Sequence, residues 1–142
     1  MKELKTEIVL NAPVNKIWNV LTDFEAYTEW NPFIISSKGE AKEGTRLTNT
    51  MLNNGKEMVF KPIVTKVERD KHFEWLGSAM GGLFKGRHYF ILEDLGNNTT
   101  KLIHGEQFTG LLSNLVIRMI GEETLRNFQR MNKALQEEVE QH

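Results

Sequence analysis

The sequence predicts an α+β fold in which a curved antiparallel sheet wraps around a long carboxyl-terminal helix. Three observations predict it: a first strand followed by two short helices, a middle region of strands and turns, and a helical apolar pattern from residue 111 onward. A chain of 142 residues is long enough to bury a core. We therefore expect a single domain over residues 1–142.

The first strand and helix are predicted from a change of period. Residues 3–10 alternate as a strand does. Pro13 follows them and should occupy the first position of a helix. The apolar face of this helix, of about two to three turns, is formed by Val14, Ile17, Trp18 and Leu21.

A second short helix should begin at residues 22–25, where Thr22 and Glu25 have the spacing of a capping box. It should end before Pro32, because the residue preceding a proline is pushed out of the helical region. Four aromatic residues fall in this stretch: Phe24, Tyr27, Trp30 and Phe33. They either fill the core or line a binding site.

The middle of the chain indicates strands joined by turns. Residues 42–44 and 53–55 are turn sequences, and the Asn-Gly of the second indicates a hairpin. Residues 58–67 indicate one long strand that contains Pro62. Because proline cannot donate to a neighbouring strand, this strand should lie at an edge or carry a bulge.

The later strands bring the predicted number between the short helices and the terminal helix to six. One strand covers residues 73–79, and a last hairpin joins residues 83–95 to residues 99–109. The pair Gly81-Gly82 is interpreted as a turn rather than a phosphate-binding loop.

The terminal helix is predicted from apolar residues at helical spacing: Leu112, Leu115, Met119, Leu125, Phe128, Leu135 and Val139. Gly121 is a point at which this helix can bend. Residues 111–120 are apolar around most of the helix circumference. This start of the helix is therefore either tightly buried or available to a membrane or a partner.

Composition excludes several classes of protein. Apolar residues make up 39% and charged residues 26%, with a net charge of -1 and no basic cluster, so a nucleic-acid partner is not expected. Cysteine is absent, which excludes disulfides and thiolate chemistry. No transmembrane segment or signal-peptide pattern is present, and we predict a cytoplasmic protein.

The chain resembles the START-like superfamily, also called SRPBCC, and within it the polyketide cyclase/dehydrase-type branch. The resemblance rests on "NAPVNKIWNVLTDFEAYTEWNPF", "KPIVTKVERDKHFEWLG" and "GRHYFILEDLGNNTTKLIHGEQFTGLL", in that order, with the terminal helix. It implies a helix-grip fold with a hydrophobic cavity between the sheet and the helix. Relatives range from lipid, sterol and hormone carriers to enzymes that close polyketide rings.

Strand parity indicates which side chains face such a cavity, because residues two apart share a face. On the last hairpin, His88, His104 and Glu106 share their faces with large apolar residues and are assigned inward. The predicted ligand-binding residues are Trp30, Phe33, Trp75, His88, Phe90, His104, Glu106, Phe108, Leu115 and Met119. Apolar walls would supply affinity, and the few polar groups would orient the ligand.

The three polar residues admit other interpretations. His88, His104 and Glu106 could satisfy one another, as buried polar groups usually do, or they could provide the acid and base of an enzyme. Two imidazoles and a carboxylate could also bind a metal, but nothing in the resemblance points to one. We predict no metal and no cofactor.

Three functions stay open on the sequence alone. We favour a carrier or sensor of a small hydrophobic molecule, such as a lipid, over a polyketide cyclase- or dehydratase-like enzyme. An interaction module of the chaperone-activator kind shares the fold, but no sequence feature marks a surface for a protein partner.

Overall fold

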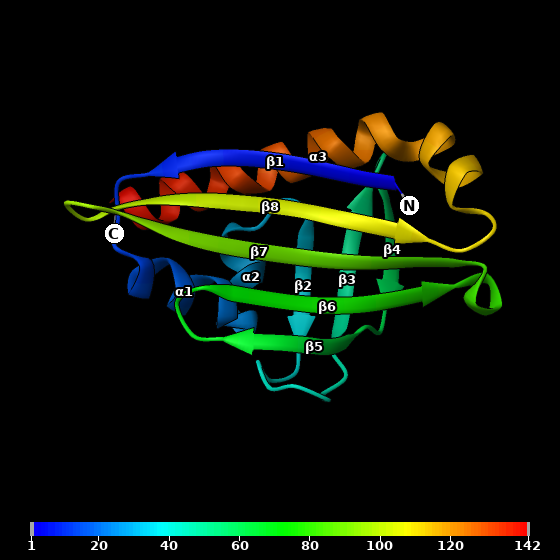
Figure 1. Cartoon of the computed structure of the whole chain (residues 1–142), viewed down its shortest axis with the longest axis horizontal. Coiled ribbons are helices and arrows are strands. Elements are labelled where there is room, and N and C mark those ends of the chain that lie inside the picture. The colour runs from blue at the N-terminus through cyan, green and yellow to red at the C-terminus, as the bar shows by residue number, and fades with distance from the viewer. Residues whose placement is uncertain (1, 142) are drawn as a thin grey trace.

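A computed structural model describes residues 2–141 and confirms the α+β helix-grip architecture (Figure 1). The chain begins with β1 (Lys2–Leu10), α1 (Val14–Thr22), a short 3-10 helix (Phe24–Ala26) and α2 (Tyr27–Trp30). The strands that follow are β2 (Ile34–Lys38), β3 (Thr48–Asn53), β4 (Lys56–Phe60), β5 (Ile63–Glu68), β6 (His72–Ala79), β7 (Phe84–Gly96) and β8 (Thr99–Thr109). The long helix α3 (Ser113–Gln141) ends the described chain and runs beside β1.

The curved antiparallel sheet is divided into two hydrogen-bonded sections. One section has the strand order β1-β8-β7-β6-β5, and the other has the order β2-β3-β4. Backbone bonds from Leu47 to Pro62 (2.8 Å) and from Val64 to Thr45 (2.9 Å) join the two sections. In Figure 1 the three shorter strands lie crosswise behind β5–β8.

Pro62 explains the one difference in strand number. The predicted strand over residues 58–67 is two strands, β4 and β5, which belong to different sections. Proline has no N–H for a ladder, and the chain turns there from one section to the other. Seven strands therefore stand between α2 and α3 where six were expected.

The starts of the two short helices also differ in detail from prediction. Pro13 precedes α1 as its N-cap, with an extended ψ of 157°, and its carbonyl accepts from Lys16 and Ile17. The capping box at residues 22–25 does not form, because the Thr22 hydroxyl donates to the carbonyl of Trp18 at 2.8 Å. The exit from α2 is fixed by the Asn31 side chain, whose oxygen accepts from two following backbone N–H groups.

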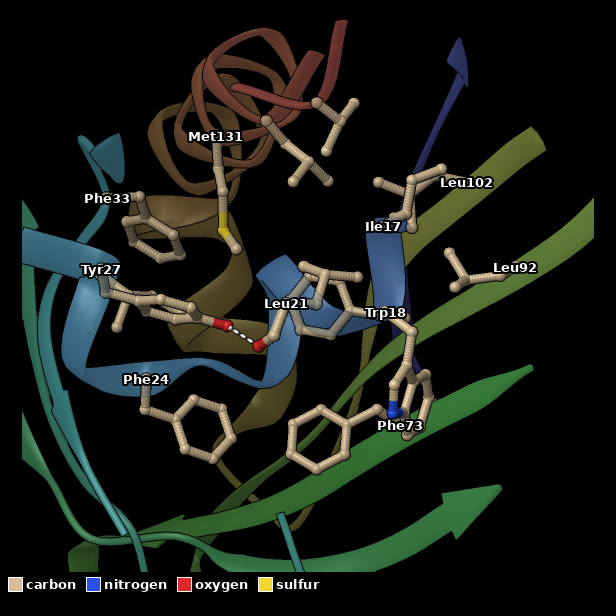
Figure 2. Close-up of a cluster of buried hydrophobic side chains, with 14 of the residues drawn as sticks. Ile17, Trp18, Leu21, Phe24, Tyr27, Phe33, Phe73, Leu92, Leu102 and Met131 are labelled. Atoms are coloured by element: carbon tan, nitrogen blue, oxygen red, sulfur yellow. Dashed lines mark hydrogen bonds between the residues drawn. The ribbon is translucent and has the colours of Figure 1, made fainter. Parts of the chain in front are cut away.

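The core lies where α1, the 3-10 helix and α2 cover one end of the sheet. Figure 2 shows Tyr27 beside Leu21, with a hydrogen bond from the Tyr27 hydroxyl to the Leu21 carbonyl, and Phe24 and Phe73 below them. Phe73 is fully buried, with its ring centroid 5.7 Å from that of Phe24 and 6.2 Å from that of Trp18. Burial, and next the charge of Asp23, raise the pKa of Tyr27 far above its usual value.

Within residues 2–141, no helix combines the length and the apolar character that a membrane crossing requires.

Candidate ligand-binding cavity

A cavity of about 130 Å³ lies between the ends of β6 and β8 with the start of β7, the hairpin β3–β4 and the early turns of α3. This volume is roughly ten times the ~10–15 Å³ that one water molecule needs on a comparable measure. Its apolar lining consists of Phe33, Met51, Met58, Phe60, Pro62, Trp75, Ala79, Phe84, Phe108 and Ile120. The other lining residues are Asn53, Gly77, Ser78, Gly86, Glu106 and Thr124.

Two glycines open the sheet side of this cavity. Gly77 on β6 and Gly86 on β7 are directly paired across the strands, and both occupy the inward parity. A Cβ atom at Gly86 would collide with the carboxylate of Glu106, whereas one at Gly77 would make only ordinary contacts, the nearest at 3.9 Å. Gly86 therefore provides the space in which the Glu106 carboxylate lies.

Glu106 brings a carboxylate to the cavity wall, and His88 stands next to it on the paired strand. Nδ1 of His88 is 3.5 Å from Oε1 of Glu106. The His88 side chain is only 1% exposed and that of Glu106 is 19% exposed. The imidazole stacks on Trp75, with ring centroids 4.8 Å apart. The carboxylate thus faces the cavity while its imidazole partner lies in the core behind it.

A chain of hydrogen bonds continues inward from His88. Its Nε2 lies 2.8 Å from Nε2 of His104, and Nδ1 of His104 lies 2.8 Å from the amide oxygen of Asn132. The Asn132 amide nitrogen donates to the hydroxyl of Thr6 at 2.8 Å, and that hydroxyl donates to the His104 carbonyl. Burial, and next the nearby His88, hold the pKa of His104 well below its usual value. The inner imidazole is therefore neutral.

The predicted site residues fall into three groups. Phe33, Trp75, Glu106 and Phe108 line the cavity. His88, Phe90 and His104 face inward as predicted but are buried beside or behind the wall rather than in it. Trp30 is partly buried and packs edge-to-face on Tyr27, with centroids 5.3 Å apart.

The last two predicted residues, Leu115 and Met119, point away from the cavity and are 52% and 73% exposed. The prediction that they line it is therefore wrong in geometry. Ile120 and Thr124, one turn apart on the neighbouring helix face, line the cavity instead. Residues 111–120 are apolar around most of the helix circumference, so periodicity could not indicate which face turns inward.

Sequence reasoning missed the hairpin β3–β4, which contributes Met51, Asn53, Met58 and Phe60 to the wall. It also missed Thr6 and Asn132. Asn132 is a buried polar residue in the middle of the apolar stripe that includes Phe128 and Leu135. A polar residue at such a position needs a partner, and that was the signal available in the sequence.

The geometry also concerns the possibility that His88, His104 and Glu106 bind a metal. The Nε2 atoms of the two histidines face each other at 2.8 Å. Within the described part of the chain, no three His, Cys, Asp or Glu side chains are arranged so that they could hold a metal ion.

Sequence comparison shows that the chain belongs to the family described as "Polyketide cyclase / dehydrase and lipid transport", which matches residues 1–140. The fold and the family together place it in the START-like superfamily. None of the curated proteins matches the sequence.

Solved structures share the fold at low sequence identity. A START superfamily protein from Mycobacterium smegmatis is 23% identical, with a TM-score of 0.76 over 98% of this chain and 97% of that chain. The Zhui aromatase/cyclase from Streptomyces sp. R1128 is 14% identical, with a TM-score of 0.81 over 98% of this chain and 93% of that one. A hypothetical protein from Helicobacter pylori is 15% identical, with a TM-score of 0.80 over 97% and 88%. These likenesses establish the fold.

Proposed function

We propose that the protein binds a small hydrophobic molecule of lipid-, polyketide- or aromatic-like character in this cavity, as a carrier or sensor. The observation that supports this is a mostly apolar cavity between the sheet and α3 with one carboxylate in its wall. Each Å² of apolar ligand surface removed from water contributes about 25 cal/mol, so such walls favour apolar ligands. Convergent polar groups in an apolar cavity are typical of small-molecule sites.

Native mass spectrometry of the freshly purified protein should reveal a retained small molecule. Independently, titration with the neutral fluorescent probe N-phenylnaphthylamine should show saturable binding at micromolar concentrations. The variant Ala79→Phe places a ring in the cavity from a partly exposed position of β6. It should lower the affinity for the probe by about tenfold or more.

Met119→Trp is the matched control, since it adds a ring to the outer face of α3 and should leave the affinity unchanged. Equal probe affinity in Ala79→Phe and wild type, with both folded, would contradict binding in the cavity.

A second candidate is an enzyme of the cyclase or dehydratase kind. The contact between Glu106 and His88 favours it, because a carboxylate backed by an imidazole can give or take a proton at the cavity wall. We expect no turnover of a co-purified ligand. Conversion by the wild type that Glu106→Gln lowers by about a hundredfold or more would instead establish the enzyme.

A further inference from the structure

One oxygen of the cavity carboxylate has no partner within residues 2–141. Oε1 of Glu106 faces His88 at 3.5 Å, whereas Oε2 lies over Gly86 in the space that a side chain would fill. No donor from the described residues forms a hydrogen bond with Oε2. The ligand group that Oε2 can bind depends on the direction of the hydrogen bonds behind Glu106.

The hydrogen bonds behind Glu106 have donors and acceptors that can be assigned one after another. The Thr6 hydroxyl donates to the His104 carbonyl, so it accepts from the amide nitrogen of Asn132. The amide oxygen of Asn132 then faces Nδ1 of His104, which must carry a hydrogen. Because His104 is neutral, its Nε2 carries none and is an acceptor.

This direction determines which nitrogen of His88 bonds to His104. Nε2 of His88 must donate to the bare Nε2 of His104, 2.8 Å away. Nδ1 of His88 then faces Oε1 of Glu106 at 3.5 Å. Oε2, which lies over Gly86, is left as an acceptor for a ligand.

The rest of the wall sets the charge that a ligand can bring. Glu106 is the only charged residue among those that line the cavity in the described chain. A carboxylate ligand would lose its hydration without meeting a cation. An ammonium ligand has three donors to satisfy, and the mostly apolar wall would replace little of the hydration that it loses. An uncharged hydroxyl can donate to Oε2 without bringing a further charge into the cavity.

We propose that the cavity selects an uncharged apolar ligand bearing a hydroxyl group, which donates its hydrogen to Oε2 of Glu106. This inference rests on the proposed function, because it specifies the ligand of the same cavity.

The experiment compares four probes with one ring system by calorimetric titration at pH 7: naphthol, naphthalene, naphthoic acid and naphthylmethylamine. At this pH naphthol is neutral, naphthoic acid is an anion and naphthylmethylamine is a cation. In the wild type, naphthol should bind about tenfold or more tighter than naphthalene, as one hydrogen bond to a charged group provides. The two ionic probes should bind at least about tenfold more weakly than naphthol.

Two variants locate the effect at Glu106. Glu106→Leu removes the acceptor, so naphthol should lose its advantage over naphthalene. Glu106→Gln keeps an acceptor oxygen in a side chain of similar shape without the charge, and should retain part of that advantage. Glu93→Leu, on the exposed face of β7, is the matched control and should leave the ranking unchanged.

The outcomes separate this inference from the proposed function. If naphthoic acid or naphthylmethylamine binds as tightly as naphthol, or if naphthol keeps its advantage in Glu106→Leu, the inference is wrong and the cavity remains a ligand site. The wild-type ranking of the four probes tests the inference even where Glu106→Leu does not fold. If none of the four probes binds, both the inference and the proposed function fail.

Discussion

The inner face of the sheet is filled at one end and hollow at the other. We call the part around Phe73 and Leu92, which α1, the 3-10 helix and α2 cover, the closed half. The open half is the part around Gly77 and Gly86, which the hairpin β3–β4 and the early turns of α3 cover. Both halves belong to the same strands, β6 and β7.

The difference between the halves arises from side-chain volume at equivalent positions. On the inward parity of β6, Phe73 and Trp75 are followed by Gly77 and Ala79. Phe73 packs against Trp18 and Phe24 of the covering helices and closes the space there, whereas Gly77 and Ala79 line the cavity with little side-chain volume. A cavity in this fold therefore depends on a few small residues at one end of two strands.

The largest expected effect is a loss of stability caused by a substitution in the closed half. Phe73→Ala should lower the free energy of unfolding by about 3–5 kcal/mol, because it removes a fully buried ring from a packed cluster. Phe84→Ala, a partly exposed cavity residue, should cost clearly less. Urea denaturation of both variants checks this, and an equal cost would mean that the two halves are packed alike.

The paired glycines test the open half. Gly86→Ala should lower stability by about 1–3 kcal/mol and displace the carboxylate, since its Cβ collides with Glu106. Gly77→Ala should change stability by only about 0.5 kcal/mol, because its Cβ finds ordinary contacts. Thermal denaturation of the two variants measures the difference. A Gly86→Ala protein as stable as wild type would show that the Glu106 carboxylate does not need the space at Gly86.

The buried imidazole of His104 should make stability depend on pH. The pKa of His104 is lowered in the folded protein, while in the unfolded chain it is near ~6.5. Below about pH 6.5 the unfolded chain binds a proton that folded His104 refuses, so stability falls as the pH falls toward the folded pKa.

The contribution of His104 is at most about 1.4 kcal/mol per pH unit. It is measured as the difference in unfolding free energy between wild type and His104→Gln from pH 7 down to about pH 5. The same pH dependence in both proteins would show that His104 is not held neutral.

The smallest expected effect concerns one hydroxyl in the closed half. Tyr27→Phe removes the bond to the Leu21 carbonyl but keeps the ring, so it should cost about 0.5–1.5 kcal/mol. Chemical denaturation measures it, and probe affinity in the open half should not change. A loss of affinity would show that the two halves are coupled.

Much of the fold followed from the sequence because its signals are local. Alternation on β7 and β8 placed His88, Phe90 and His104 inward, and the structure confirms that all three are buried. The turn at Asn54-Gly55 and the helical period after Gly110 are equally local.

What the sequence did not indicate depends on contacts between distant segments. Thr6 and Asn132 are 126 residues apart and meet only when β1 lies beside α3. The covering role of β3–β4 depends on the switch between sheet sections at Pro62, which no periodicity describes. Leu115 and Met119 were misplaced because that part of α3 is apolar around most of its circumference.

The most direct test of a ligand site in the open half is to map where a hydrophobic probe binds, using backbone amide resonances during a titration with naphthol. We predict that shifts concentrate at Gly77, Gly86 and Thr124 in the open half, while Leu21 and Phe73 in the closed half stay unchanged. Shifts confined to the exposed side of α3 around Leu115 and Met119, with none at the two glycines, would contradict a ligand site in the cavity.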